Sequence, residues 1–84
     1  MNRQEVKDYI LGAVSERLKL FDVKDTEVND SFDLVKSGLL DSMAFVDLIA
    51  DIEEKFKVEI DFEKVADEAA FTSMGGLVKI ILDA

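Results

Sequence analysis

The fold is decided by residues 41–56, whose sequence is DSMAFVDLIADIEEKF. An α-helix turns by about 100° per residue, and with that rotation the apolar side chains of this stretch gather into one narrow stripe. Apolar residues at this spacing predict a helix with one buried face. The members of this core face are Phe45, Leu48, Ile49, Ile52 and Phe56. Asp41 and Ser42 stand before the helix as a capping pair.

Upstream of this helix, the sequence predicts one further helix and a long loop. An apolar residue recurs every four positions, which predicts an amphipathic helix over residues 3–19. These apolar residues are Val6, Ile10 and Val14. From residue 21 to residue 40 the period is lost and turn-forming residues are frequent, so we expect a loop with one short helical turn near residues 32–36. Scattered apolar residues predict that this loop docks onto the helices: Val28, Phe32, Leu34 and Leu39.

Downstream of the central helix, the sequence predicts a connector and two more helices. Residues 57–61 form a brief extended connector, and a short helix follows near Phe62–Asp67. A final helix begins at Met74, because Thr72 or Ser73 can cap an apolar run there. The last part of the chain is therefore expected to be helical as well.

These elements predict an all-α fold class: a small bundle of three principal helices plus one short helix, with a long first loop. With 84 residues, of which 49% are hydrophobic, the chain is expected to be a single domain over residues 1–84. No apolar run approaches the ~20 residues of a membrane span, and the N-terminal residues are too polar for a signal peptide. We therefore expect a soluble, cytoplasmic protein with no integral membrane segment.

Composition argues against several classes of function. Nineteen acidic residues against ten basic residues give a net charge of −9, which argues against binding to nucleic acid, whose phosphates are held by clustered Lys and Arg. The chain contains no Cys and no His, so disulfides, thiolate chemistry and the usual general base are missing. The acidic residues of the loop lack the order and the glycine of an EF-hand. We expect neither a metal site nor enzymatic catalysis.

The central helix has a second face that differs from its core face. Residues 41–54 hold five acids and no base, although like charges on one helix are mildly destabilising. The apolar members of this face are Met43, Val46 and Ala50, and its acidic border is Asp47, Glu53 and Glu54. Two interpretations are open. Either the face is simply solvated and Met43 packs under the preceding loop, or it is an apolar patch ringed by charge that docks a basic partner.

Ser42 also has two interpretations. A serine before an apolar-periodic run is commonly an N-cap. Alternatively, its hydroxyl is a site of covalent modification, because the unpaired N–H groups and partial positive charge of a helix N-terminus favour a phosphodiester. No His or Lys lies beside it in the sequence, so another protein would have to make the modification.

The stretch LLDSMAFVDLIADIEEKFKVEID, residues 39–61, resembles the core of an acyl carrier protein. The similarity extends over essentially the whole chain, including Ser31-Phe32 in the loop and the closing Thr/Ser-capped helix. It implies the acyl-carrier fold and a non-catalytic role. It also implies that Ser42 is the attachment site of 4′-phosphopantetheine, transferred from coenzyme A by a separate transferase, with cargo held as a thioester on the terminal thiol. Asp41 matches the aspartate that precedes this serine in the family.

The resemblance further implies docking to partner enzymes through the helix at Ser42. The matching positions are Met43, Val46, Asp47, Ala50, Glu53 and Glu54. The expected partners are a phosphopantetheinyl transferase and the acyl- or aminoacyl-loading and downstream biosynthetic enzymes. Such enzymes would present basic surfaces to a monomeric carrier.

Some features depart from fatty-acid-type carriers. The motif is SGLLDSM, residues 37–43, and Ala44 stands where those carriers have an acidic residue, while Ala50 replaces a larger apolar residue. This variant is similar to D-alanyl carrier proteins and other stand-alone aminoacyl or peptidyl carriers. We therefore expect a specialised stand-alone carrier in fatty acid, polyketide or nonribosomal peptide biosynthesis. The alternatives are a D-alanyl carrier for cell-wall modification and a helical adaptor without an arm.

Overall fold

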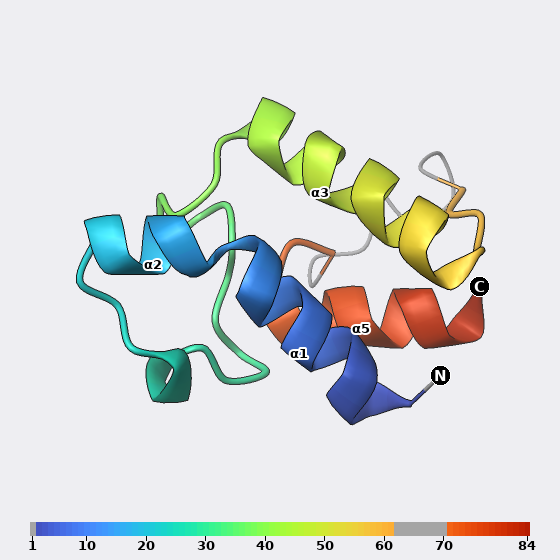
Figure 1. The fold of residues 1–84 in the computed structure, drawn as a ribbon, viewed down its shortest axis with the longest axis horizontal. Coiled ribbons are helices and arrows are strands. Elements are labelled where there is room, and N and C mark those ends of the chain that lie inside the picture. The colour runs from blue at the N-terminus through green and yellow to red at the C-terminus, as the bar shows by residue number, and fades with distance from the viewer. Residues whose placement is uncertain (1, 62–70) are drawn as a thin grey trace.

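Helices dominate the chain, as the apolar spacing predicts. A computed structural model describes residues 2–61 and 71–84. Its helices are α1 (Arg3–Ala13), α2 (Ser15–Leu20), the 3-10 turn η1 (Asp25–Glu27), α3 (Ser42–Phe56) and α5 (Met74–Asp83). Helix α1 lies against α5, and α3 lies above both in the view of Figure 1. Over the described ranges the chain forms no strand beyond one isolated bridge, so the all-α prediction is confirmed. The short helix predicted near Phe62–Asp67 lies outside the described residues.

The single helix predicted over residues 3–19 is wrong, because the chain forms two helices that meet at Val14. Val14 has φ −102° and ψ 8°, outside helical values. The apolar residues here recur strictly every four positions, and all are at most 3% exposed: Val6, Ile10, Val14 and Leu18. In a straight helix each step of four overshoots a full turn by about 40°, so Leu18 would lie about 120° away from Val6. The change of direction at Val14 returns Leu18 to the core.

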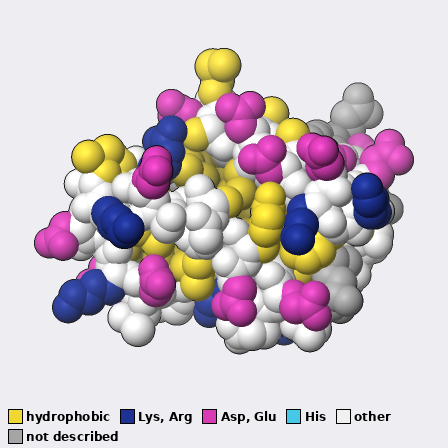
Figure 2. Space-filling view, viewed as in Figure 1, with side chains coloured by type: hydrophobic (Ala, Val, Ile, Leu, Met, Phe, Trp, Pro, Cys, Tyr) yellow, Lys and Arg dark blue, Asp and Glu magenta, His cyan; other side chains and the backbone are white. Residues whose placement is uncertain are grey.

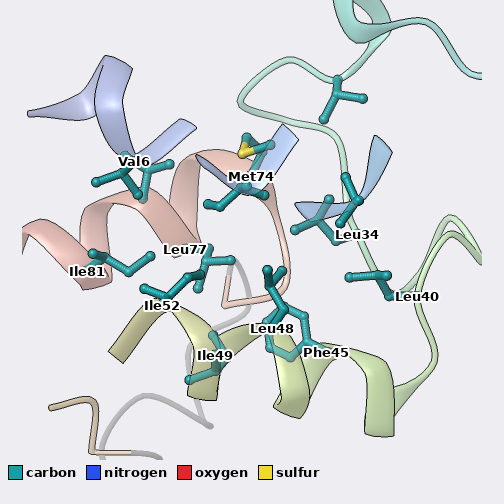
Figure 3. Close-up of a cluster of buried hydrophobic side chains, with 14 of the residues drawn as sticks. Val6, Leu34, Leu40, Phe45, Leu48, Ile49, Ile52, Met74, Leu77 and Ile81 are labelled. Carbon is teal, nitrogen blue, oxygen red and sulfur yellow. The ribbon is translucent and has the colours of Figure 1, made fainter. Parts of the chain in front are cut away.

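The core lies between α3 and the helices beneath it. The predicted core face of α3 is confirmed, because Phe45, Leu48, Ile49 and Ile52 are all buried. In Figure 3 these side chains point toward Leu77 and Ile81 of α5, with Val6 of α1 on the far side. Phe56 is half-buried at the end of the face and meets the Tyr9 ring edge-on, with 5.5 Å between ring centroids.

The long loop between α2 and α3 is anchored by its apolar side chains, as predicted. Val28, Leu34 and Leu39 are buried, and Phe32 is half-buried against the same core. A single helical turn forms close to residues 32–36, as expected, because the Ser37 N–H donates to the Asp33 carbonyl at 3.2 Å, and a separate 3-10 turn lies earlier, at η1. The loop therefore packs as part of the fold rather than as a free linker.

The first turn of α5 is tied to the loop. Helix propensity alone predicts a weak turn that frays, because Gly75 and Gly76 each cost roughly 1 kcal/mol relative to Ala. In the structure Ser73 is the N-cap and its hydroxyl accepts the Gly76 N–H at 3.1 Å. The Gly75 N–H donates to the Asp30 carbonyl at 2.9 Å. The Asp30 carboxylate in turn binds the Arg3 guanidinium at 2.8 Å, so the loop joins the starts of α1 and α5.

Candidate functional site

Ser42 is the first residue of α3 and not its cap. The N-cap is Asp41, whose carboxylate oxygen Oδ1 accepts the Ala44 N–H at 2.7 Å. The interpretation of Ser42 as an N-cap is therefore wrong, because Asp41 performs that role alone. Ser42 is exposed, and its hydroxyl has no hydrogen-bond partner among the residues that the structure describes. A hydroxyl in this position is accessible to another protein.

The backbone at the start of α3 has unused donors. In the described part of the chain, the N–H groups of Ser42 and Met43 donate to no acceptor, whereas the Phe45 N–H reaches the Asp41 carbonyl at 2.9 Å. Free N–H groups and the positive end of the helix dipole lie together at a helix N-terminus, where they favour an anionic group. The negative charge of the Asp41 carboxylate would repel an added anion. This carboxylate accepts a hydrogen bond only from the Ala44 N–H, so the N–H groups of Ser42 and Met43 are not used by it.

The residues just before Ser42 hold it in place. Leu39 and Leu40 are buried, and the Leu40 N–H donates to the Leu34 carbonyl at 2.9 Å. Gly38 adopts φ 88°, a conformation that glycine takes without strain. The Arg17 guanidinium of α2 reaches the Leu39 carbonyl at 3.4 Å. Buried leucines therefore fix the path of the chain up to Leu40, and the chain returns to the surface at Asp41 and Ser42.

The second face of α3 is exposed, as one of the two sequence interpretations requires. Met43 is 77% exposed and Val46 is 51% exposed, so the interpretation in which Met43 packs under the loop is wrong. Asp47, Ala50 and Glu54 are exposed as well. Figure 2 shows acidic side chains gathered over α3. We call Met43, Val46, Asp47, Ala50 and Glu54 the α3 surface.

Glu53 differs from the other five positions that the sequence grouped with it. It is half-buried, and its carboxylate accepts the Ile60 N–H at 3.0 Å. Ile60 is itself buried in the core. Glu53 thus holds the connector after α3 against the end of the helix. No signal in the sequence separates it from Glu54, because the contact depends on how the chain turns back after residue 57.

A second pair of exposed apolar side chains was not predicted from the sequence. Leu20 is 78% exposed and Phe21 is 53% exposed at the end of α2. The basic residues Arg17 and Lys19 lie in the last turn of the same helix. A signal was present in the sequence, because the four-residue repeat that ends with Leu18 leaves Leu20 and Phe21 off the buried side.

The described ranges give no support to a metal site or a membrane span. No group of three or more potential metal ligands occurs among residues 2–61 and 71–84. None of the helices within those ranges combines the length and the apolar character that a membrane crossing needs.

Comparison with known families assigns the chain to a family. Residues 8–79 match the family model described as phosphopantetheine attachment site. The chain belongs to this family. Members of the phosphopantetheine attachment family carry a covalently bound 4′-phosphopantetheine and act as carriers rather than catalysts. The predicted family, fold class and prosthetic group are thereby confirmed.

A curated relative supports the same assignment. Over 52 residues the chain is 38% identical to the Didymella fabae protein described as non-reducing polyketide synthase AC. The matched segment is 62% of this chain and 2% of that protein, so the chain spans a small fraction of the relative's length. No match was found among solved structures.

The residues at the start of α3 fit a phosphopantetheine group. The group is attached as a phosphodiester, which needs an accessible hydroxyl and space beside it for an anion. Ser42 supplies an exposed hydroxyl that the described residues leave unbonded, and the N–H groups of Ser42 and Met43 are available beside it. When bound, the group supplies the terminal thiol on which cargo is held, and the chain has no cysteine of its own.

Proposed function

We propose that Ser42 is the attachment residue and that the chain carries acyl or aminoacyl thioesters between enzymes. The observation that supports this most directly is the division of roles at the start of α3. Asp41 caps the helix through its bond to the Ala44 N–H, and the Ser42 hydroxyl is exposed and bonded to none of the described residues. The Ser42 oxygen would form the new bond to phosphorus and lose its proton, while the adenosine bisphosphate part of coenzyme A leaves.

The attachment proposal has a direct test. The purified chain is incubated with coenzyme A and a broad-specificity phosphopantetheinyl transferase, and its intact mass is measured. We expect one arm per chain for the wild type and for Ser31→Ala, a loop serine exposed like Ser42. Ser42→Ala should show no gain in mass. An unmodified wild type, under conditions that modify a control carrier, would refute the proposal.

We also propose that partner enzymes dock on the α3 surface. Exposed Met43 and Val46 next to Asp47 and Glu54 combine apolar area with negative charge. Enzymes that present basic residues around an apolar contact complement this combination, and the charges would speed their encounter. The proposed partners are the transferase, the loading enzyme and the downstream biosynthetic enzymes, which act on a monomeric, cytoplasmic carrier.

Charge reversal separates docking from folding. Glu54→Lys changes an exposed residue of the α3 surface, and Asp83→Lys makes the same change at the exposed end of α5. We expect Glu54→Lys to raise the KM of the transferase several-fold at low salt, with less effect at high salt, while Asp83→Lys leaves KM unchanged. Glu53→Lys is a poor probe, because Glu53 also binds the Ile60 N–H. Equal KM values for Glu54→Lys, Asp47→Lys and the wild type would remove the docking proposal.

For the cargo, we propose an acyl intermediate of a specialised biosynthetic pathway. The similarity to a protein described as a polyketide synthase favours this class. The SGLLDSM motif and Ala44 leave a D-alanyl carrier as the second candidate. Loading of the modified chain discriminates between the two, because a D-alanine-activating enzyme with ATP and D-alanine should charge only a D-alanyl carrier. Charging by that enzyme would overturn the acyl assignment.

A further inference from the structure

The Asp33 carboxylate receives three hydrogen bonds from two distant parts of the chain. Its Oδ1 atom accepts the Val35 N–H at 2.9 Å and the Lys36 N–H at 2.6 Å. Its Oδ2 atom accepts the Thr72 hydroxyl at 2.7 Å, across 39 residues of sequence. Asp33 and Thr72 are both half-buried. The loop before α3 and the residues before α5 therefore meet at one charged group.

Backbone hydrogen bonds surround this contact on both sides. The Leu34 N–H donates to the Thr72 carbonyl at 2.8 Å, and the Met74 N–H donates to the Phe32 carbonyl at 2.9 Å. Together they form the isolated antiparallel bridge between Asp33 and Ser73. The segment at Asp33 is thus fixed to the start of α5, which is a buried part of the core.

After Asp33 the chain closes a tight loop over residues 34–40, which ends two residues before Ser42. The Leu34 carbonyl accepts the Leu40 N–H at 2.9 Å, so residues 34–40 begin and end at the same place. Within this loop the Ser37 N–H donates to the Asp33 carbonyl at 3.2 Å. Ser42 follows Leu40 by two residues. The position of Ser42 is therefore fixed relative to α5 by the contacts of Asp33 and Leu34, and not by α3 alone.

We propose that Asp33 is a positioning residue for Ser42, and that its bonds to Thr72 and to the 35–36 backbone hold the attachment serine where a modifying enzyme meets it. This inference rests on the proposed attachment at Ser42. Asp33 does not touch the hydroxyl. It acts through the closed loop of residues 34–40, because Asp41 and Ser42 directly follow Leu40, where that loop closes on Leu34.

Removal of the Thr72 hydroxyl is the most selective way to perturb the hydrogen bonds of Asp33. Thr72→Val removes the hydroxyl and keeps the shape of the side chain, whereas Thr72→Ser keeps the hydroxyl. Asp33→Asn retains an oxygen for the two N–H groups and removes the charge. Asp30→Asn is the matched control, because Asp30 lies in the same loop but its carboxylate binds Arg3 and Lys7 of α1 instead.

Two measurements are made on each variant. Amide hydrogen exchange of Leu34 and Leu40 reports the closed loop, and exchange of Ile49 and Ile52 in α3 reports the rest of the fold. Loss of a hydrogen bond to a charged group should lower the protection of Leu34 and Leu40 about tenfold in Thr72→Val and Asp33→Asn. We expect Thr72→Ser and Asp30→Asn to resemble the wild type, and the α3 amides to change less than the loop amides.

Transferase kinetics then separate positioning from stability. If only a fraction of molecules presents Ser42 correctly, KM rises by the inverse of that fraction while kcat is kept. We expect the KM for Thr72→Val and Asp33→Asn to rise by the inverse of the closed-loop fraction that exchange of Leu34 and Leu40 gives for each variant, about threefold for a fraction of one third, with recovery in Thr72→Ser. Unchanged loop protection, or a KM that departs from this inverse, would overturn the inference. A wild-type chain that gains no arm at all refutes the attachment proposal instead, and hydrogen exchange still tests the bonds made by Asp33.

Discussion

Replacement of Gly75 by alanine tests how strongly the close approach between α5 and the loop constrains the fold. A Cβ atom on Gly75 would lie 2.8 Å from the Asp30 Cβ and 2.9 Å from the Asp30 carbonyl oxygen. Real Cβ atoms do not approach other atoms so closely, and one of the two contacts is with backbone, which cannot rotate away. Gly75→Ala must therefore push the loop and the first turn of α5 apart.

The expected change in the free energy of unfolding combines one stabilising and two destabilising contributions. Alanine is better than glycine in a helix by up to ~1 kcal/mol. Forcing extra volume into a packed contact costs about 1–3 kcal/mol, and losing the bond between the Gly75 N–H and the Asp30 carbonyl costs about 1 kcal/mol more. The net expectation is a loss of roughly 1–3 kcal/mol in the free energy of unfolding.

Gly12 in α1 is the matched control. A Cβ atom added to Gly12 would meet no atom within 4 Å, and the residue is exposed. Gly12→Ala should therefore stabilise the chain by about 0.5–1 kcal/mol, the ordinary gain in helix propensity. The same substitution at two helical glycines is expected to act with opposite signs.

Urea unfolding followed by far-UV circular dichroism measures both effects. With a slope near 1 kcal/mol/M for a small protein, the midpoint should fall by roughly 1–3 M for Gly75→Ala and rise by up to ~1 M for Gly12→Ala. A Gly75→Ala variant that is as stable as the wild type or more stable would refute the close approach. Propensity would then decide the stability of α5.

Three further predictions concern the cap, the carboxylate of Asp33 and the exposed end of α2. Asp41→Ala should cost ~1 kcal/mol of stability in urea unfolding, because the Ala44 N–H loses its acceptor; no change would mean that another group caps α3. Burial acts to raise the pKa of Asp33, but hydrogen bonds from Lys36, Thr72 and Val35, together with the Lys36 charge, hold it below the ordinary value of 3.8. The resulting stabilisation is present above that value and is lost as the pH falls through the lower folded-state pKa. The stability difference between wild type and Asp33→Asn should therefore shrink below pH ~3.8, and a difference that grows in acid would contradict the assignment. Leu20→Ala should change stability by less than ~0.5 kcal/mol, whereas Leu18→Ala should cost about 2–5 kcal/mol; similar losses at both positions would contradict their different burial.

The core of the fold could be predicted because it is local in sequence. The α3 stripe has no glycine or proline to interrupt it, so a period of 3.6 residues is sufficient to identify Phe45, Leu48, Ile49 and Ile52 as buried. The α1–α2 break could not be seen in the same way. A repeat of exactly four residues fits a helix over three members, and only Leu18, the fourth, requires the change of direction at Val14.

The attachment serine and the α3 surface could be proposed from sequence, while the groups that support them could not. Asp41 and Ser42 are adjacent, and which of them caps the helix depends on backbone angles rather than on residue type. The bond from Thr72 to Asp33 joins residues 39 positions apart, and a single sequence contains no signal for such a pairing. The different roles of Glu53 and Glu54 likewise arise only when the connector folds back and brings the Ile60 N–H to Glu53.

The exposed apolar side chains have a consequence for how the protein behaves at high concentration. Leu20, Phe21, Met43 and Val46 are each more than half exposed, so they can make contacts between molecules. At neutral pH the net charge of −9 keeps molecules apart by mutual repulsion. That repulsion vanishes near the isoelectric point of about 4.3. Colloidal solubility, rather than unfolding, is then expected to set the lower pH limit for concentrated samples.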